Sequence, residues 1–190
     1  MILRIFVCSL IGFAALSYSV GSVIDAELYQ RQLRHAFEQQ RQSPNKAVRS
    51  AGEPFIENIE IPKIGLSVMI ADGIDNKTLR RAVGHVPGTV FPGDMGNAAL
   101  AAHRDTFFRN LGSVAKGDEI IVNTRRGTFH YVVKSTEVVR PNAVRVLRPT
   151  PSPELTLITC YPFYYIGPSP KRFIVHAILS SPPGETVNNR

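Results

Sequence analysis

The segment Leu155-Thr156-Leu157-Ile158-Thr159-Cys160-Tyr161-Pro162-Phe163 gives the clearest indication of the fold. Its aliphatic and β-branched residues predict a strand over 155–160. Pro162 ends regular pairing, because proline has no N–H to donate to a sheet. The strand therefore delivers Cys160 at its end, where a rigid scaffold can hold a reactive group while loops leave it accessible. A single cysteine is more often a small packed side chain, so Cys160 alone does not define a site.

Similar short runs of β-forming residues surround this segment. A turn at 125–127 predicts a hairpin between two of them, and Asp75 and Asp105 are placed to cap short helices. Many short strands with few short helices predict a mainly β domain that is closed as a barrel or packed as a sandwich. The expected strands are 56–61, 66–71, 98–103, 119–124, 128–139, 155–160 and 173–179.

The N-terminus begins with Arg4 followed by an apolar stretch from Ile5 to Ile24. About 20 apolar residues are enough to cross a bilayer as a helix. The positive charge on the N-terminal side favours a body outside the cytoplasm. A cleaved signal peptide is the alternative and also exports the body. Because the apolar stretch is long for a signal peptide, residues 1–24 are predicted to be an uncleaved membrane anchor.

Composition also predicts the structure of the remaining segments. Residues 25–54 are predicted to form a juxtamembrane helix and a linker, with Leu28, Leu33 and Phe37 on one helical face. Residues 55–180 form the predicted folded domain. The polar tail 181–190 contains Pro-Pro-Gly and is predicted to be disordered.

Composition narrows the possible functions of the 190-residue chain. Its formal net charge of +7 comes from scattered basic residues, so no nucleic-acid partner is expected. Two cysteines, Cys8 and Cys160, lie in different settings and predict no disulfide framework. The acidic residues are spread out, whereas calcium needs several oxygen ligands in one place, so no metal and no cofactor is expected.

Two other expected strand ends carry residues that would suit Cys160. His103 ends the strand 98–103, and Arg172 begins the last strand. A thiolate is a nucleophile, an imidazole can protonate a leaving amine, and a guanidinium can stabilise an oxyanion. Together the three would suit acyl transfer through a thioester. Taken singly each is more often structural or a surface residue, and sequence spacing does not show that they meet.

Several separated motifs resemble those of sortases, specifically the class D-like group. They are HRDTFFRNL from His103, TLITCYPF from Thr156 and RFIV from Arg172, together with IPKIG at 61–65, Gly84-His85 and PGDMGN at 92–97. The resemblance covers residues 55–179. It implies a closed eight-stranded β-barrel with short helices, preceded by one N-terminal transmembrane helix.

The resemblance also implies roles for particular residues. Cys160 would attack a Thr–Gly or Thr–Ala bond in an LPxTG-type sorting signal, His103 would act as general acid, and Arg172 would hold the substrate and its oxyanion. Thr159 would help to place the substrate threonine. His85 matches a second family histidine, for which a structural or substrate-flanking role is expected.

The resemblance further implies partners and a location. The partners would be secreted proteins with LPxTG-like signals and an amine acceptor on the cell envelope. The chain would be a single-pass protein of the cell membrane, with its catalytic domain on the extracytoplasmic side.

Two alternatives remain. One is a non-catalytic envelope peptide-binding module with the same fold and a buried Cys160. The other is a papain-like hydrolase, which is disfavoured because its cysteine lies on a helix and precedes its histidine. Here His103 precedes Cys160, and Cys160 ends a strand.

Overall fold

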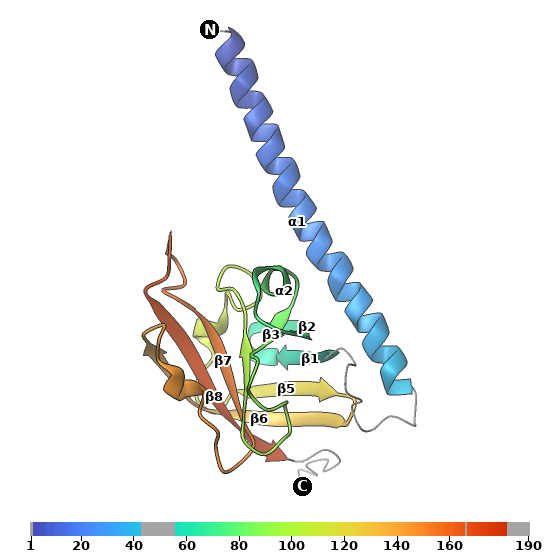
Figure 1. Ribbon diagram of the computed structural model, residues 1–190, viewed down its shortest axis with the longest axis vertical. Coiled ribbons are helices and arrows are strands. Elements are labelled where there is room, and N and C mark those ends of the chain that lie inside the picture. The colour runs from blue at the N-terminus through green and yellow to red at the C-terminus, as the bar shows by residue number, and fades with distance from the viewer. Residues whose placement is uncertain (1, 43–55, 166, 182–190) are drawn as a thin grey trace.

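The computed structural model describes residues 2–42, 56–165 and 167–181, and it contains one barrel and one long helix (Figure 1). Eight strands close the barrel in the order β1-β2-β3-β4-β7-β8-β6-β5. The expected mainly β, closed eight-stranded barrel is therefore confirmed. The predicted linker at 43–54 and tail residues 182–190 lie outside the described residues.

Strand bounds differ from the expected ones by only a few residues. The exception is β3, which the sequence did not reveal because three residues are too short for an alternating pattern. The strands are β1 (Ile56–Ile61), β2 (Leu66–Asp72), β3 (Val83–His85), β4 (Asn97–Ala101), β5 (Glu119–Thr124), β6 (Gly127–Val139), β7 (Glu154–Tyr161) and β8 (Lys171–Ser181). β4 ends at Ala101, so His103 follows the strand instead of ending it.

Of the two predicted helix caps, one is confirmed and one is wrong. Asp75 accepts hydrogen bonds from the backbone N–H groups of Lys77 and Thr78 and starts α2 (Asn76–Arg81). After Asp105 the chain instead forms turns over 104–110, followed by the short 3₁₀ helix η2 (Leu111–Ser113). Phe108 is fully buried in the main core, so tertiary packing overrides the local capping signal. Two further 3₁₀ helices are η1 (Pro62–Ile64) and η3 (Val144–Leu147).

The barrel interior is filled by inward-facing side chains from all eight strands, together with Phe108 and Leu111 from the segment after β4. Tyr131 is fully buried in this interior, and its hydroxyl accepts a hydrogen bond from the Gly93 N–H at 2.7 Å. Burial raises the pKa of the Tyr131 phenol to about 12, so the hydroxyl stays neutral. The strand residues that alternate with these inward positions face outward, and some of them carry the polar groups described below.

The predicted anchor and juxtamembrane helix are parts of one continuous helix, α1 (Ile2–Gln42). Leu33 and Phe37 pack against Met69 of β2 and against Ala82. Leu28 does not share this face and is exposed, because a five-residue spacing does not return to the same side of a helix with 3.6 residues per turn. The C-terminal part of α1 is therefore docked on the barrel, while its N-terminal part extends away from it (Figure 1).

A buried polar side chain fixes the position of this docked part. Gln30 accepts a hydrogen bond from the Met69 N–H at 2.8 Å and donates one to the Arg81 carbonyl at 2.6 Å. Arg81 also binds Asp25, with Nε 2.6 Å from Oδ2 and a second bond of 2.7 Å to Oδ1. These contacts tie α1 to both β2 and α2.

Replacing Gln30 with alanine is expected to loosen this docking. The substitution leaves a buried backbone donor and a partly buried acceptor unsatisfied, which costs about 1–3 kcal/mol. We expect a lower thermal unfolding midpoint for the full chain in detergent. Gln32→Ala on the exposed side of α1 is the matched control and should leave the midpoint unchanged. Equal midpoints for the two variants would show that Gln30 does not hold the helix.

Candidate active site

Strand pairing brings two of the three candidate residues directly opposite each other. β7 and β8 pair antiparallel, and in this register Cys160 is the partner of Arg172. Both side chains are partly exposed, and the Cys160 thiol is free. Cys160 and Arg172 are therefore neighbouring residues on two adjacent strands.

A parallel pairing on the other side of β7 brings His103 to the same end of the barrel. β4 pairs with β7 so that Ala101 is level with Ile158. His103 lies two residues after Ala101, and Cys160 lies two residues after Ile158. The backbone stays joined beyond β4, because the Ala102 N–H donates to the Ile158 carbonyl at 3.2 Å. Cys160 on the middle strand thus has His103 on one side and Arg172 on the other.

Side-chain alternation shows which face of the barrel carries the site. Leu157 belongs to the main core inside the barrel, whereas Ile158 packs with Ile174 in a separate apolar cluster under η3. Cys160 lies two residues after Ile158, and Arg172 lies two residues before Ile174. Because side chains on a strand alternate between faces, both lie on the outer face, where a peptide could reach them.

Thr159 has a defined structural contact. It is buried, and its hydroxyl donates to the Ala102 carbonyl at 2.8 Å. This bond holds the end of β7 against the segment that leads into His103. The Thr159 hydroxyl is therefore engaged by the backbone and faces the interior of the barrel.

His85 is buried at the end of β3, next to β4. Its Nε2 lies 3.0 Å from the Val90 carbonyl, which can only accept, so Nε2 carries a proton. Its Nδ1 lies 3.3 Å from an Asp72 carboxylate oxygen, and the ring stacks on Phe91 with centroids 4.7 Å apart. Contacts on both ring nitrogens and one ring face favour a structural role for this histidine.

The sequence did not single out Arg104, which has more contacts near the site than the predicted residues. Its guanidinium donates to the carbonyls of Pro162 at 3.0 Å, Tyr165 at 2.7 Å and Gly167 at 3.2 Å, and to the Ser169 hydroxyl. All four acceptors belong to the connection between β7 and β8, here called the β7–β8 loop (residues 162–165 and 167–170). The available signal was its position directly after His103 in the HRDTFF motif.

Arg172 is bound to the same loop. Its Nη1 donates to the Lys171 carbonyl at 2.9 Å and to the Ser169 carbonyl at 3.3 Å. The two arginines therefore contact the β7–β8 loop from different elements, Arg104 from the turns after β4 and Arg172 from β8. The loop begins two residues after Cys160.

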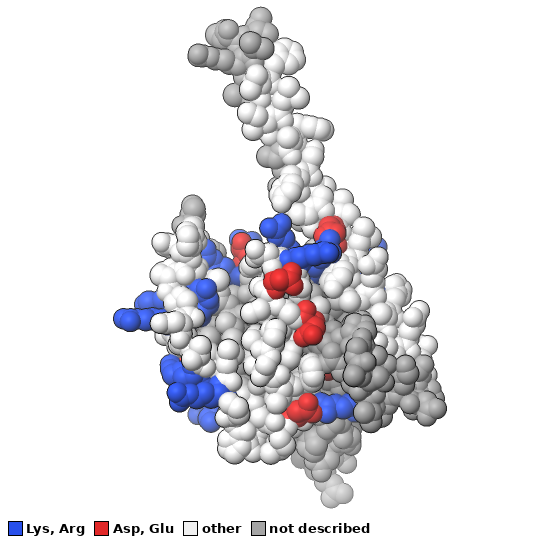
Figure 2. All heavy atoms as spheres, in the orientation of Figure 1, with Lys and Arg blue, Asp and Glu red and all other residues white. Residues whose placement is uncertain are grey.

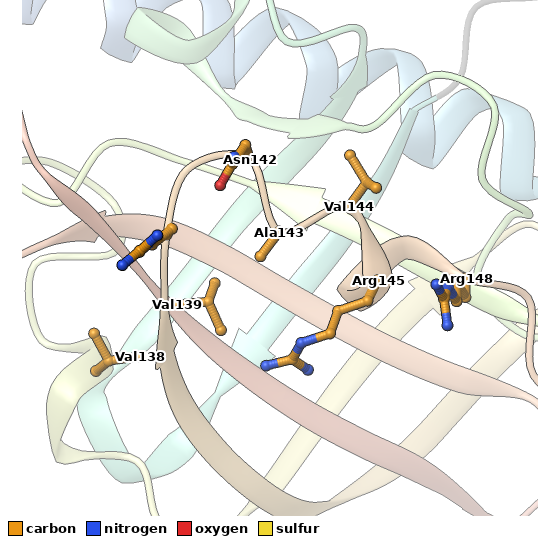
Figure 3. A pocket seen from close by; sticks show the side chains of 8 residues that line it. Val138, Val139, Asn142, Ala143, Val144, Arg145 and Arg148 are labelled. Atoms are coloured by element: carbon orange, nitrogen blue, oxygen red, sulfur yellow. The ribbon is translucent and has the colours of Figure 1, made fainter.

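A hollow of about 450 Å³ lies one strand further along the outer face (Figure 3). Val139 lines it and pairs with Arg172 across β6 and β8. Arg145 is bound to the Glu137 carboxylate with Nη1 2.9 Å from Oε1, and this bond lowers the pKa of Glu137. The other lining residues are Val138, Arg140, Asn142, Ala143, Val144 and Arg148. Apolar side chains and three arginines therefore line the hollow.

The other two histidines of the barrel each contact a glutamate carboxylate. His130 Nδ1 lies 2.7 Å from Glu119, and His176 Nε2 lies 3.0 Å from Glu137. Within the described part of the chain, no three His, Cys, Asp or Glu side chains gather closely enough to hold a metal ion.

A model of the sortase domain matches residues 59–180. The chain belongs to the sortase family. Sortase D of Bacillus subtilis is 37% identical over 119 residues, which cover 62% of this chain and 60% of that protein. Sortase A of Bacillus anthracis is 28% identical over 124 residues, which cover 63% and 57%. The matched region therefore spans somewhat more than half of each relative.

Solved sortase structures agree with the barrel. A Sortase D5 transpeptidase of Clostridium perfringens superposes with a TM-score of 0.66 at 28% identity and covers 82% of this chain and 98% of its own. Sortase A of Corynebacterium diphtheriae gives 0.65 at 26% identity, with 91% of each chain covered. The expected family is confirmed, and the class D-like assignment is consistent with these relatives. Sortases are cysteine transpeptidases.

Proposed function

We propose that this sortase is a membrane-anchored transpeptidase that uses Cys160 as its nucleophile. It would cleave a Thr–Gly or Thr–Ala bond in an LPxTG-type sorting signal of a secreted protein and transfer the acyl chain to an amine of the cell envelope. The supporting observation is the register of β4, β7 and β8. It places Cys160 opposite Arg172 and next to the segment carrying His103, on the outer face of the barrel.

The proposed reaction has two halves. In the first, the Cys160 thiolate attacks the threonine carbonyl carbon, and the carbon–nitrogen bond breaks to leave a thioester. Protonated His103 gives its proton to the departing amine. In the second half the acceptor amine attacks the thioester, its proton passes to His103, and the thiolate leaves. Arg172 donates hydrogen bonds to the oxyanion formed in each half.

The remaining candidates support these three residues in the proposal. Thr159 keeps the end of β7 against Ala102 and so fixes the spacing of thiol and imidazole. His85 stabilises β3 and the connection that follows it. The hollow beside Arg172 offers a place for part of the substrate or acceptor, and its arginines favour a group with negative charge.

The proposal places the enzyme in the cell membrane as a single-pass protein. Among the described residues one helix, within Ser9–Gln42, is long and apolar enough to cross a bilayer, with a window of mean hydropathy 1.4. Residues 1–24 would be the anchor, 25–54 the juxtamembrane segment, and 55–180 the catalytic domain outside the cytoplasm.

A direct test is incubation of the full chain in detergent with a library of sorting-signal peptides and several amine acceptors. Mass spectrometry should show an acyl adduct on Cys160, a cleaved Thr–Gly or Thr–Ala bond and an amide product with one acceptor. Peptides that bind without adduct, cleavage or product would instead indicate the non-catalytic binding module.

Replacing Arg104 with alanine is expected to impair this reaction without touching the nucleophile. Loss of four hydrogen bonds would release the β7–β8 loop beside Cys160, and misplacement of supporting groups by about 1 Å can cost roughly 100-fold in rate. We expect kcat/KM for peptide cleavage to fall about 10–100-fold. Arg109→Ala, an exposed arginine in the same turns, is the matched control. Unchanged cleavage by the Arg104 variant would show that the loop needs no such support.

A further inference from the structure

The β7–β8 loop has the composition of a membrane-interface segment. Between Tyr161 and Lys171 the sequence contains no charged residue. Tyr164 is 88% exposed and Tyr165 is 47% exposed, although both are large aromatic side chains. Exposed tyrosines in an uncharged segment are typical of the interface between lipid and water, where an apolar ring and a polar hydroxyl are both satisfied.

The position of the bilayer boundary follows from α1. No charged residue lies between Arg4 and Asp25, so a spanning helix would leave the bilayer near Asp25. Asp25 is bound through both carboxylate oxygens to Arg81 at the end of α2. The outer boundary of the bilayer would therefore lie at the level of α2 on the barrel.

The β7–β8 loop extends beyond that level. In Figure 1 it projects from the barrel in the direction in which the N-terminal half of α1 extends, and it stands higher in that view than α2. Figure 2 shows charged side chains gathered where α1 meets α2, and basic side chains beside the white atoms at the upper left, where Figure 1 places the loop. The exposed Lys77 and Arg80 of α2 would face anionic headgroups at the boundary.

From these observations we propose that the β7–β8 loop inserts Tyr164 and Tyr165 into the headgroup region of the bilayer that holds α1. This inference rests on the proposed membrane-spanning role of α1. The docked Gln30, Leu33 and Phe37 make helix and barrel one body, so anchoring α1 also places the loop. Cys160, two residues before the loop, is then held close to the outer surface of the membrane.

Tryptophan fluorescence tests the insertion, because the chain contains no tryptophan and each substitution creates a single probe. Tyr164→Trp changes an exposed side chain and should not disturb the core. Phe13→Trp, 71% exposed in the apolar part of α1, reports whether the helix spans. Met95→Trp is the matched control: Met95 is exposed, and the neighbouring Gly96 binds Glu154 at the other end of β7 from Cys160.

Each full-length variant is reconstituted into vesicles of phosphatidylcholine and phosphatidylglycerol whose acyl chains are brominated. Interfacial side chains lie about 5–10 Å into the headgroup and acyl boundary, so bromines near the headgroup should quench Tyr164→Trp at least about twofold. Phe13→Trp should be quenched most by bromines near the chain ends, and Met95→Trp should not be quenched.

The other outcomes separate the two proposals. If Phe13→Trp is quenched but Tyr164→Trp is quenched no more than Met95→Trp, the insertion of the loop is overturned. The membrane-spanning role of α1 is then retained. Absence of quenching for Phe13→Trp would reject both the spanning helix and the insertion, without bearing on transpeptidation in detergent. Emission of Tyr164→Trp that responds to a sorting-signal peptide but not to brominated lipid would assign the loop to the peptide and overturn the insertion.

Discussion

Cys160→Ala is expected to abolish acyl-enzyme formation and peptide cleavage while the barrel remains folded. Removal of a catalytic nucleophile lowers turnover by several orders of magnitude, and we expect a loss of at least about 1,000-fold. The cost in stability should be small, because Cys160 is partly exposed on the outer face and does not belong to the apolar clusters of the barrel. Mass spectrometry of the thioester and thermal unfolding of the same sample measure both effects.

Two controls sharpen this expectation. Cys160→Ser keeps a side chain of similar shape and should also be inactive, since a hydroxyl without an activating base is a weak nucleophile. Cys8→Ser removes the second cysteine of the chain and should leave both the adduct and the product unchanged. Turnover retained by Cys160→Ala, or an adduct that disappears with Cys8, would exclude Cys160 as the nucleophile.

The sequence predicted the parts of the site that depend on local pattern. The run from Leu155 to Cys160 is recognisable as a strand because its residues favour extended backbone, and Pro162 marks its end. The hairpin of β5 and β6 and the cap at Asp75 follow from equally local signals. The family motifs then indicated a closed barrel, which local pattern alone left undecided between a barrel and a sandwich.

The assembly of the site depends on pairings that no local pattern contains. His103 and Cys160 lie at the same end of the barrel only because β4 and β7 pair in parallel across more than fifty residues of intervening chain, with Ala101 level with Ile158. The contacts of Arg104 depend on where the β7–β8 loop folds back. The helix expected after Asp105 was wrong because burial of Phe108 in the main core overrides a capping preference.

The docking of α1 likewise depends on contacts that the sequence of the helix alone does not reveal. Leu33 and Phe37 are one turn apart and share a buried face as predicted, whereas Leu28, five residues before Leu33, is exposed. Gln30, a polar residue with no apolar signal, turned out to be buried and bound to both β2 and α2. Buried polar contacts of this kind depend on the partner surface and are not visible in the helix sequence.

Arg172→Ala is expected to slow catalysis about 100- to 1,000-fold, mainly through kcat, as loss of an oxyanion donor does in other acyl-transfer enzymes. The structure supports this because Arg172 is the direct cross-strand partner of Cys160 and shares its outer face. Its present partners are the Lys171 and Ser169 carbonyls, which can hold the guanidinium in place for the substrate. Stopped-time cleavage assays over a range of peptide concentrations separate kcat from KM.

Arg172→Lys tests whether charge alone is sufficient. A lysine ammonium keeps the charge but lacks the planar fork of donors, so it cannot bind the backbone carbonyls and an oxyanion in the same geometry. We expect most of the defect of the alanine variant to remain. Lys171→Ala, an exposed cation next to Arg172 and opposite Tyr161, is the matched control and should keep near-normal kcat. Equal losses in the Arg172 and Lys171 variants would indicate a general effect of positive charge on peptide binding, and the specific role of Arg172 at the oxyanion would be withdrawn.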